Sequence, residues 1–264
     1  MLDILSYNFF QNALIGSLFA SIIAGIIGTI IVEKKLVMLS SGIAHISFGG
    51  VGLGFFLQIN PIWGAYFLSG LASIGIVKIN NTKKSYPDTI IGMFWAFAMA
   101  LGILFIYLAP SYPPDVNSYL FGDILTISKT NIYLIIATTI ITLAIFITFY
   151  NHWIAYLFDS NYFKILNINK KLFDYLLFLL ITITIIALIK LVGIILVIAL
   201  LTIPPSLAKL FSKSFKKIIV LSSVFSFIFM VVGLFLSYHL NIPSGASIII
   251  TSFVIYIFTF IIKR

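Results

Sequence analysis

His45 is the ionisable side chain whose position in the sequence best suits metal chemistry. It lies in the middle of a long apolar stretch, with Ser41 one helical turn before it and Met38 nearly two turns before it. Gly49 and Gly52 continue the same helical face, so this side of the helix is small and polar. A neutral imidazole is the commonest metal-binding side chain. The pattern predicts either a metal ligand or a hydrogen bond to a neighbouring helix, and both interpretations stay open.

Two further histidines lie at the ends of apolar stretches. His239 follows Tyr238 at an end that we expect to face outside, which makes it a second candidate metal ligand. His152 precedes Trp153, a pattern typical of the aromatic belt at a membrane surface. All seven Asp and Glu residues fall in loops or at the ends of apolar stretches.

Catalytic and nucleotide-binding motifs are missing from the sequence. It contains neither a phosphate-binding loop nor a dinucleotide fingerprint, so we expect that the chain does not hydrolyse ATP itself. It also contains no cysteine, which excludes disulfides and thiolate metal sites. The sequence therefore predicts a protein that is not an enzyme and that holds no tightly bound cofactor.

The apolar stretches must be the elements that position these histidines. The chain has 264 residues, of which 61% are hydrophobic and 9% charged, whereas about a quarter of the residues in a soluble protein are charged. Stretches such as 132–149 and 218–236 run unbroken, which favours spanning helices over the alternating strands of an outer-membrane barrel. We expect an all-α, polytopic transmembrane bundle that forms a single domain over residues 1–264.

Charged residues, proline and asparagine divide the chain into nine expected spans. They cover residues 12–32, 36–57, 62–79, 89–109, 132–155, 172–189, 191–208, 218–238 and 246–262. The spans 172–189 and 191–208 are separated by little more than Lys190 and Gly193, and a re-entrant arrangement there would reduce the count to eight. Pro204 and Pro205 predict a kink or a split in the seventh span.

Basic residues predict the orientation of these spans. With the N-terminus outside and the C-terminus inside, all of the 16 Lys and Arg residues except Lys129 and Lys190 fall on the inner side. The net charge of +9 therefore indicates membrane topology, and we expect no nucleic-acid partner.

A short segment of the inner loop 158–171 is apolar on one side. Asp159 could cap the start of a helix, and the residues after it would form its apolar face; these are Tyr162, Phe163, Ile165 and Leu166. A solvated loop has no need of such a face. The segment either folds back on the lipid surface or docks into another protein.

Five blocks of the sequence resemble a known family. Residues 39–54, LSSGIAHISFGGVGLG, resemble the second-helix motif of the permease subunits of metal ABC importers, the zinc, manganese and iron class. Residues 120–125 resemble the outer-loop motif of that family, and residues 158–166 resemble its coupling-helix loop. Residues 190–208 and 236–245 resemble the two remaining blocks, in the same order.

This resemblance implies a homodimeric permease in the plasma membrane of a bacterium or archaeon. Two cytoplasmic ATPase subunits that use ATP and an external metal-binding protein would be its partners, and a divalent metal or metal chelate its cargo. The fold would be similar to that of the cobalamin and siderophore permeases. His45 and Ser41 would line the translocation path, and the apolar face of 158–166 would contact the ATPase. Ser41 and Asn241 stand where family members commonly carry Asp, and a hydroxyl is a weaker ligand for divalent cations than a carboxylate.

Two other function classes remain as alternatives. A secondary cation carrier or channel would use the Gly-rich second span with His45, although the absence of carboxylates at membrane depth argues against it. A membrane-embedded hydrolase would need a nucleophile with a base or a metal cluster, and the sequence shows neither.

Overall fold

The computed structural model describes residues 7–80, 87–110, 117–122, 124–159, 163, 165 and 168–263. Within these residues all regular secondary structure is helical, which confirms the predicted all-α class. The elements are α1 (Asn8–Glu33), α2 (Val37–Phe56), α3 (Pro61–Asn80), α4 (Pro87–Tyr107), α5 (Asn117–Phe121), the 3-10 turn η2 (Ile124–Thr126), α6 (Lys129–Thr148), α7 (Tyr150–Phe158), α9 (Lys170–Phe211), α10 (Phe215–Leu240) and α11 (Ser244–Ile262).

Seven of the described helices are long and apolar enough to cross a membrane: α1, α2, α4, α6, α9, α10 and α11. Helix α9 has 42 residues, so at 1.5 Å per residue it would be ~63 Å long if straight, about twice the thickness of the hydrocarbon core. It therefore has length enough for two crossings. Helix α3, which was also expected to span, is not among the seven. The count of nine spans stays a prediction.

The break within α9 lies at Gly193 rather than at the two prolines. Gly193 has φ 76° and ψ 165°, a conformation that only glycine adopts readily, and it joins two helical segments across a kink. The helix continues through Pro204 and Pro205, so the predicted split there is wrong. Proline at 205 cannot donate to the carbonyl oxygen of Leu201, and that oxygen lies against Gly28 of α1. Because Gly28 has no side chain, α1 packs closely against α9 at the turn that contains the two prolines.

The span predicted at 132–155 is also shorter than expected. Helix α6 ends at Thr148, Phe149 leaves the helical conformation with φ −105° and ψ 24°, and α7 begins at Tyr150. A pattern of apolar residues cannot locate such a break, because Phe149 and its neighbours continue the apolar stretch on both sides.

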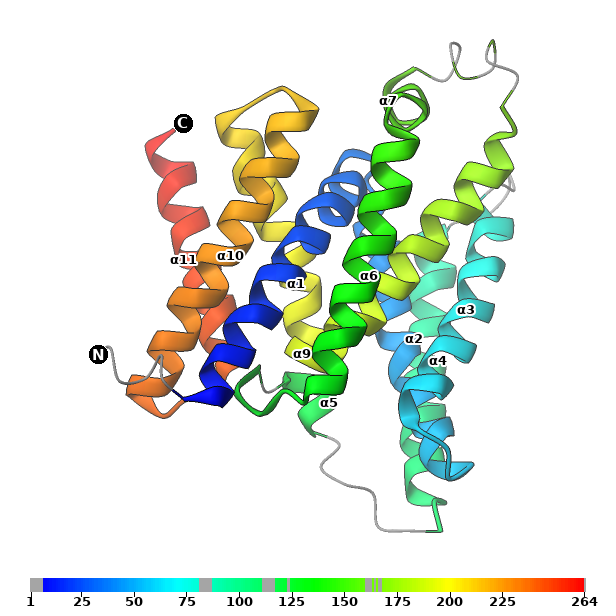
Figure 1. The fold of residues 1–264 in the computed structure, drawn as a ribbon. Helices are drawn as coiled ribbons and strands as arrows, with labels where there is room; N and C mark the ends of the chain where they lie inside the picture. The colour runs from blue at the N-terminus through cyan, green and yellow to red at the C-terminus, as the bar shows by residue number, and fades with distance from the viewer. Residues whose placement is uncertain are drawn as a thin grey trace. The chain divides into compact units, whose positions relative to one another are not determined.

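The chain packs as two compact units, each made of segments distant in sequence. The first comprises the residues up to Glu33, Asn117–Leu143 and those from Ala187 onward. In it α1 lies against α10, and α10 lies against α11 (Figure 1). Phe10 contacts Phe235 and Gly25 lies against Ser223, so α1 and α10 are antiparallel. The small residues along α1 therefore serve packing within the unit, as close helix approach requires.

The second unit comprises Lys34–Val116 and Ala144–Ile186. In it α2 packs against both α3 and α4 (Figure 1). A methyl group at Gly52 would lie 2.7 Å from Cα of Gly102, and one at Gly54 would lie 2.6 Å from Cα of Pro61. The glycines of α2 thus allow α3 and α4 to approach its backbone, which places His45 between packed helices. The single membrane domain expected over residues 1–264 stays a prediction.

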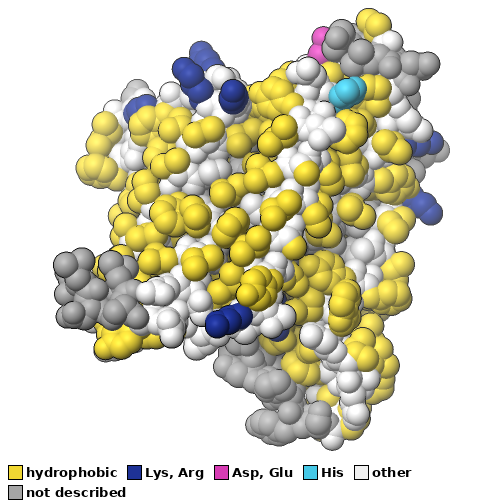
Figure 2. Space-filling model, viewed as in Figure 1, with side chains coloured by type: hydrophobic (Ala, Val, Ile, Leu, Met, Phe, Trp, Pro, Cys, Tyr) yellow, Lys and Arg dark blue, Asp and Glu magenta, His cyan; other side chains and the backbone are white. Residues whose placement is uncertain are grey.

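Apolar side chains dominate the face of the molecule displayed in Figure 2. Many are large and highly exposed on the spanning helices, among them Phe97, Tyr133, Ile147, Phe258 and Ile261. Exposed apolar surface of this extent is expected where a helix faces lipid. It agrees with the predicted membrane location.

Candidate functional site

His45 is held in a defined orientation by its own helix. Its Nδ1 lies 2.8 Å from the backbone carbonyl oxygen of Ser41, one turn earlier in α2. A carbonyl oxygen only accepts hydrogen bonds, so Nδ1 carries the proton and the lone pair of the neutral ring is on Nε2. Fixing one ring nitrogen in this way is how proteins prepare the other as a metal ligand. Ser41 contributes its backbone to this contact, whereas the sequence suggested its hydroxyl.

Trp95 of α4 covers one side of the imidazole. The ring centroids of His45 and Trp95 are 3.9 Å apart, and the two planes are inclined by 35°. The indole Nε1 of Trp95 donates to Sδ of Met99, 3.0 Å away and one turn later in the same helix. Sequence reasoning did not single out Trp95, because a tryptophan within an apolar span looks like a lipid-facing residue.

Close approach of α4 to α2 brings these two rings together. A methyl group at Gly49 would lie 2.5 Å from the carbonyl oxygen of Ala98, and one at Gly42 would lie 2.5 Å from Cγ2 of Ile91. Gly42 and Gly49 flank His45 on either side along α2, while Ile91 and Ala98 flank Trp95 along α4. These two contacts at glycines of α2 therefore set how far along α4 Trp95 lies relative to His45.

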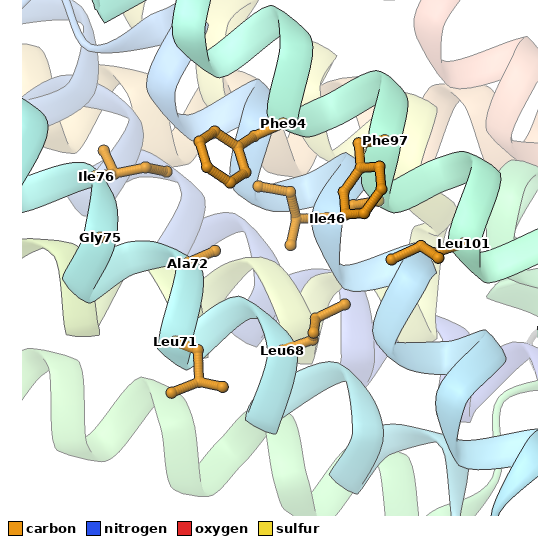
Figure 3. A pocket seen from close by; sticks show the side chains of 10 residues that line it. Ile46, Leu68, Leu71, Ala72, Gly75, Ile76, Phe94, Phe97 and Leu101 are labelled. Carbon is orange, nitrogen blue, oxygen red and sulfur yellow. The ribbon is translucent and has the colours of Figure 1, made fainter.

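An apolar pocket of about 280 Å³ is lined by residues of α2, α3 and α4 (Figure 3). Ile46, which follows His45, enters it from α2, and Phe94, which precedes Trp95, enters it from α4. The other lining side chains are also apolar: Leu68, Leu71, Ala72, Ile76, Phe97, Ala98 and Leu101, together with Gly75. Such a pocket offers no donor to a metal ion. The candidate metal ligand of this unit is therefore His45 and not a residue of the pocket.

His239 lies in the first unit, at the end of α10. It is exposed, and its ring contacts the ring of Tyr238 at 5.7 Å between centroids. The next turn is closed by Asn241 in the left-handed conformation, φ 53°, which asparagine tolerates better than most residues. A hollow of about 440 Å³ beside it is lined by Ser237, Tyr238, Asn241 and Ser244, among others, but not by His239.

No group of three or more His, Cys, Asp or Glu side chains that could hold a metal ion occurs among the residues described. His45 and Ser41 lie together in the second unit, and His239 belongs to the first. The structure thus presents single imidazoles rather than a complete metal cage within the described part of the chain.

Three of the five sequence blocks meet in the first unit. Gly122, with φ 68°, lies against Val192 and Gly193, and a methyl group at Gly193 would lie 2.7 Å from the carbonyl oxygen of Leu120. Gly245 lies against the carbonyl oxygen of Phe121. Only glycines allow three backbones to approach so closely. This contact explains why the blocks 120–125, 190–208 and 236–245 carry glycine where they do.

Lys190 has a partner next to this three-glycine contact. Its Nζ donates to the hydroxyl oxygen of Tyr119 at 2.7 Å and lies 4.1 Å from the centroid of the same ring. Burial raises the pKa of Tyr119, so the hydroxyl stays neutral and available as an acceptor. Lys190 is one of the two basic residues that the predicted orientation leaves on the outer side, and this contact gives it a partner.

The inner segment that begins at Asp159 is partly described. Asp159 is exposed, follows the last residue of α7, and accepts a hydrogen bond at its carbonyl oxygen from the backbone N–H of Phe163, 3.0 Å. Ile165 is 78% exposed, as a docking residue should be. Phe163 is only 3% exposed, so the prediction that its side chain faces a partner is wrong. Tyr162 and Leu166 lie outside the described residues.

Phe163 is buried because it completes an aromatic cluster. Its ring packs edge-on against those of Tyr156 and Phe173, with centroids 5.7 and 5.2 Å away. Trp153 contacts both Tyr156 and Phe173 at 5.9 and 5.2 Å. Together these four residues, Trp153, Tyr156, Phe163 and Phe173, form the inner aromatic cluster.

Two charged residues border the inner aromatic cluster. The hydroxyl of Tyr156 donates to Oδ1 of Asp174 at 2.6 Å, and Nζ of Lys34 donates to the carbonyl oxygen of Tyr156 at 2.7 Å. Burial, together with the hydrogen bond and charge of Asp174, raises the pKa of Tyr156 far above its usual value. Burial and the nearby Lys170 lower the pKa of Lys34, while Asp174 opposes that shift. Sequence reasoning did not connect these residues, which lie on three different segments.

Comparisons with known proteins agree on one family. The sequence profile of the ABC 3 transport family matches residues 6–263. The chain is 35% identical over 264 residues to the uncharacterized membrane protein slr2045 of Synechocystis, covering 100% of this chain and 94% of that protein. It is 31% identical over 258 residues to the manganese transport system membrane protein MntC of Listeria monocytogenes, covering 98% and 92%.

A solved structure agrees with these matches. A chain of PsaBC from Streptococcus pneumoniae, determined in complex with Fab, superposes with a TM-score of 0.87 at 31% identity. The match covers 97% of this chain and 92% of that one. The resemblance to permease subunits of metal ABC importers, expected from the five sequence blocks, is thereby confirmed. The chain belongs to the ABC 3 transport family.

Proposed function

We propose that this chain is the membrane-spanning permease of an ABC importer that carries manganese or a related divalent transition metal into the cytoplasm. The observation that carries the proposal is the match to the PsaBC chain, which extends over nearly the whole length of both proteins. MntC is named for manganese transport, which favours manganese as the first cargo to test.

Within this proposal His45 is the transient ligand of the cargo. Its Nε2 lone pair is free of the Ser41 contact, and the ring is half-buried in the glycine-rich helix α2. A translocation site must bind its ion and then release it, so one neutral imidazole is better suited than a closed cage of carboxylates. We propose that the His45 of a second copy, held by the backbone carbonyl oxygen of its own Ser41, completes the site in a homodimer.

The partner that hydrolyses ATP would dock on the inner segment at Ile165, next to the exposed Asp159. Lysines support this assignment of sides in both units. In the second unit Lys34 and Lys35 precede α2 and Lys78 lies at the end of α3, while the turn between α2 and α3 at the opposite end carries none. In the first unit Lys209 pairs with Glu33 at 3.0 Å, close to Lys213, Lys216 and Lys217 in sequence. Such an accumulation of lysine is typical of the cytoplasmic side.

Uptake of ⁵⁴Mn²⁺ into proteoliposomes tests the proposal. The permease is reconstituted with and without its ATPase and with ATP inside or absent, and an external metal-binding protein is supplied with the ion. We expect uptake only when permease, ATPase and ATP are all present. Uptake by the permease alone would contradict an ABC importer and support a secondary carrier.

Variants of the two histidines locate the site within the working complex. We expect His45→Ala to reduce uptake by about 10-fold or more at unchanged ATPase association, since a lost ligand removes at least ~1.4 kcal/mol of ion stabilisation. His152→Ala is the matched control, because the ring of His152 contacts those of Phe149 and Phe173, whereas the ring of His45 contacts that of Trp95. Unchanged uptake per folded complex in His45→Ala would remove His45 from the path.

A further inference from the structure

Tyr156 joins three segments of the second unit that are distant in sequence. Its hydroxyl binds Asp174 at the start of α9, and its carbonyl oxygen binds Lys34 in the turn before α2. Its ring contacts Phe163 of the inner segment, and Nζ of Lys34 lies 3.9 Å from the centroid of that ring. The Tyr156 side chain is 7% exposed, so its contacts with Asp174 and Phe163 are shielded from solvent, while Lys34 is half-buried.

The inner segment has one side chain that points into the protein and another that points out of it. Phe163 is 3% exposed within the inner aromatic cluster, and Ile165, two residues later, is 78% exposed. A partner that presses on Ile165 therefore presses the buried Phe163 against Tyr156 and Phe173. Because protein interiors are packed as densely as crystals, such a contact transmits a displacement instead of absorbing it.

The displacement has two routes away from the inner aromatic cluster. Phe173 and Asp174 lead into α9, which begins at Lys170. Lys34 leads into α2, which begins at Val37 and carries His45 two turns further on. Since helices are stiff along their axes, a shift of Lys34 moves the whole of α2, including the imidazole.

We propose that Tyr156 is a positioning residue that couples the docking segment to α2 and α9, so that ATP-driven movement at Ile165 reaches His45. This inference rests on the proposed function, because it assigns the docking segment to an ATPase. It goes beyond that function by naming the contact that links the two sites: the Tyr156 hydroxyl on Asp174, with Lys34 on the carbonyl oxygen of the same residue.

The competing explanation is that these contacts only stabilise the fold. A set of variants separates the two. Tyr156→Phe keeps the ring and its aromatic contacts but removes the hydroxyl, and Asp174→Asn keeps an oxygen acceptor of the same size. The double variant Tyr156→Phe with Asp174→Leu removes both hydrogen-bonding groups. Replacing both partners by apolar groups costs less stability than leaving one of them buried without a partner.

The experiment measures ⁵⁴Mn²⁺ taken up per ATP hydrolysed in proteoliposomes with the full complex, together with the melting temperature of each complex. We expect about 5-fold less Mn²⁺ per ATP for Tyr156→Phe, the factor that corresponds to one lost intramolecular hydrogen bond of about 1 kcal/mol. Asp174→Asn should retain the wild-type ratio. The double variant should melt no lower than Asp174→Leu alone, because no buried hydroxyl is left without an acceptor, and it should still be uncoupled.

Three results would overturn the proposal. They are a wild-type ratio in Tyr156→Phe, a wild-type ratio in the double variant, and an uncoupled Asp174→Asn complex of wild-type stability. In the first two the hydrogen bond would serve stability alone, and in the third it would not be the coupling contact.

A second readout separates this inference from the choice of cargo. The chain contains no cysteine, so Leu57→Cys, which is at the exposed end of α2 opposite Lys34, provides a unique site for a spin label. If the wild-type complex carries no Mn²⁺, the proposed cargo fails, but the coupling is still measured. ATP should then change the spectrum of the label in the wild type and not in Lys34→Met, which removes the contact between Lys34 and the carbonyl oxygen of Tyr156; equal changes in both would overturn the coupling.

Discussion

The imidazole of His45 and the indole of Trp95 lie against each other at a centroid distance of 3.9 Å with their planes inclined by 35°, one from α2 and the other from α4. The contact restricts rotation of the imidazole, and the Ser41 carbonyl oxygen fixes its Nδ1 at the same time. Two constraints on one ring leave Nε2 in a defined position. That is the preparation that a weak, transient metal ligand needs.

Trp95→Ala should therefore raise the Mn²⁺ concentration required for half-maximal uptake. An aromatic pair is worth about 0.5–1.5 kcal/mol, so we expect a rise of about 2- to 10-fold. Trp95→Phe keeps an aromatic face beside the imidazole and should stay close to the wild type. Concentration curves of ⁵⁴Mn²⁺ uptake measure the effect, and equal curves for Trp95→Ala and the wild type would show that Trp95 does not orient His45.

Ser41→Asp should tighten metal binding and slow release. A carboxylate one turn before His45 would add a charged oxygen ligand, which divalent cations prefer to a hydroxyl. We expect uptake to saturate at a lower Mn²⁺ concentration but with a lower maximal rate. The control is Ser41→Ala, which leaves the backbone carbonyl contact to His45 in place and should change both parameters little. A higher maximal rate in Ser41→Asp would contradict the release argument.

The sequence predicted the helical class and the family, because hydropathy and the motif blocks are local properties of the chain. It did not predict Trp95 as a neighbour of His45, or Tyr156 as a neighbour of Lys34. Those relationships arise only when helices pack, and the glycines that permit the packing look alike in the sequence whatever they contact. Phe163 was assigned to a partner for the same reason: an apolar residue in a loop can cover the chain's own cluster or another protein's surface.

Gly52 of α2 and Gly75 of α3 should differ in the effect of an added methyl group on stability. Gly52→Ala would place a methyl group 2.7 Å from Cα of Gly102, a backbone atom that cannot move without shifting α4. We expect a loss of about 1–3 kcal/mol, as for other overpacked cores, and a lower melting temperature in detergent. Gly75→Ala is the control, because no atom lies within 4 Å of the added methyl group. Equal melting temperatures for the two variants would refute the packing assigned to α2 and α4.

Ile165→Asp should prevent association with the ATPase without affecting insertion of the permease. The side chain is 78% exposed on the inner segment, and a carboxylate in an apolar docking groove lacks a partner. Leu57→Asp is the matched control, because Leu57 is also exposed, at 53%, but lies at the far end of α2. Co-purification of the two subunits is the measurement. Retention of the ATPase by Ile165→Asp at the wild-type yield would exclude this residue from the interface.

Gly193→Ala should disrupt the fold more than Gly52→Ala does, because it combines backbone strain with overpacking. Gly193 has φ 76° and ψ 165°, a region that costs a residue with a Cβ of the order of 1–3 kcal/mol, and the new methyl group would also meet the backbone of residues 120–122. The two penalties fall at the contact of three sequence blocks, so we expect loss of the folded protein or a large drop in melting temperature. Ile195→Ala, two residues later, removes atoms from a side chain that is 44% exposed and should be tolerated. Size-exclusion profiles and melting curves of the two variants in detergent provide the comparison, and a stable Gly193→Ala protein would show that the segments on either side of this kink can adopt another geometry.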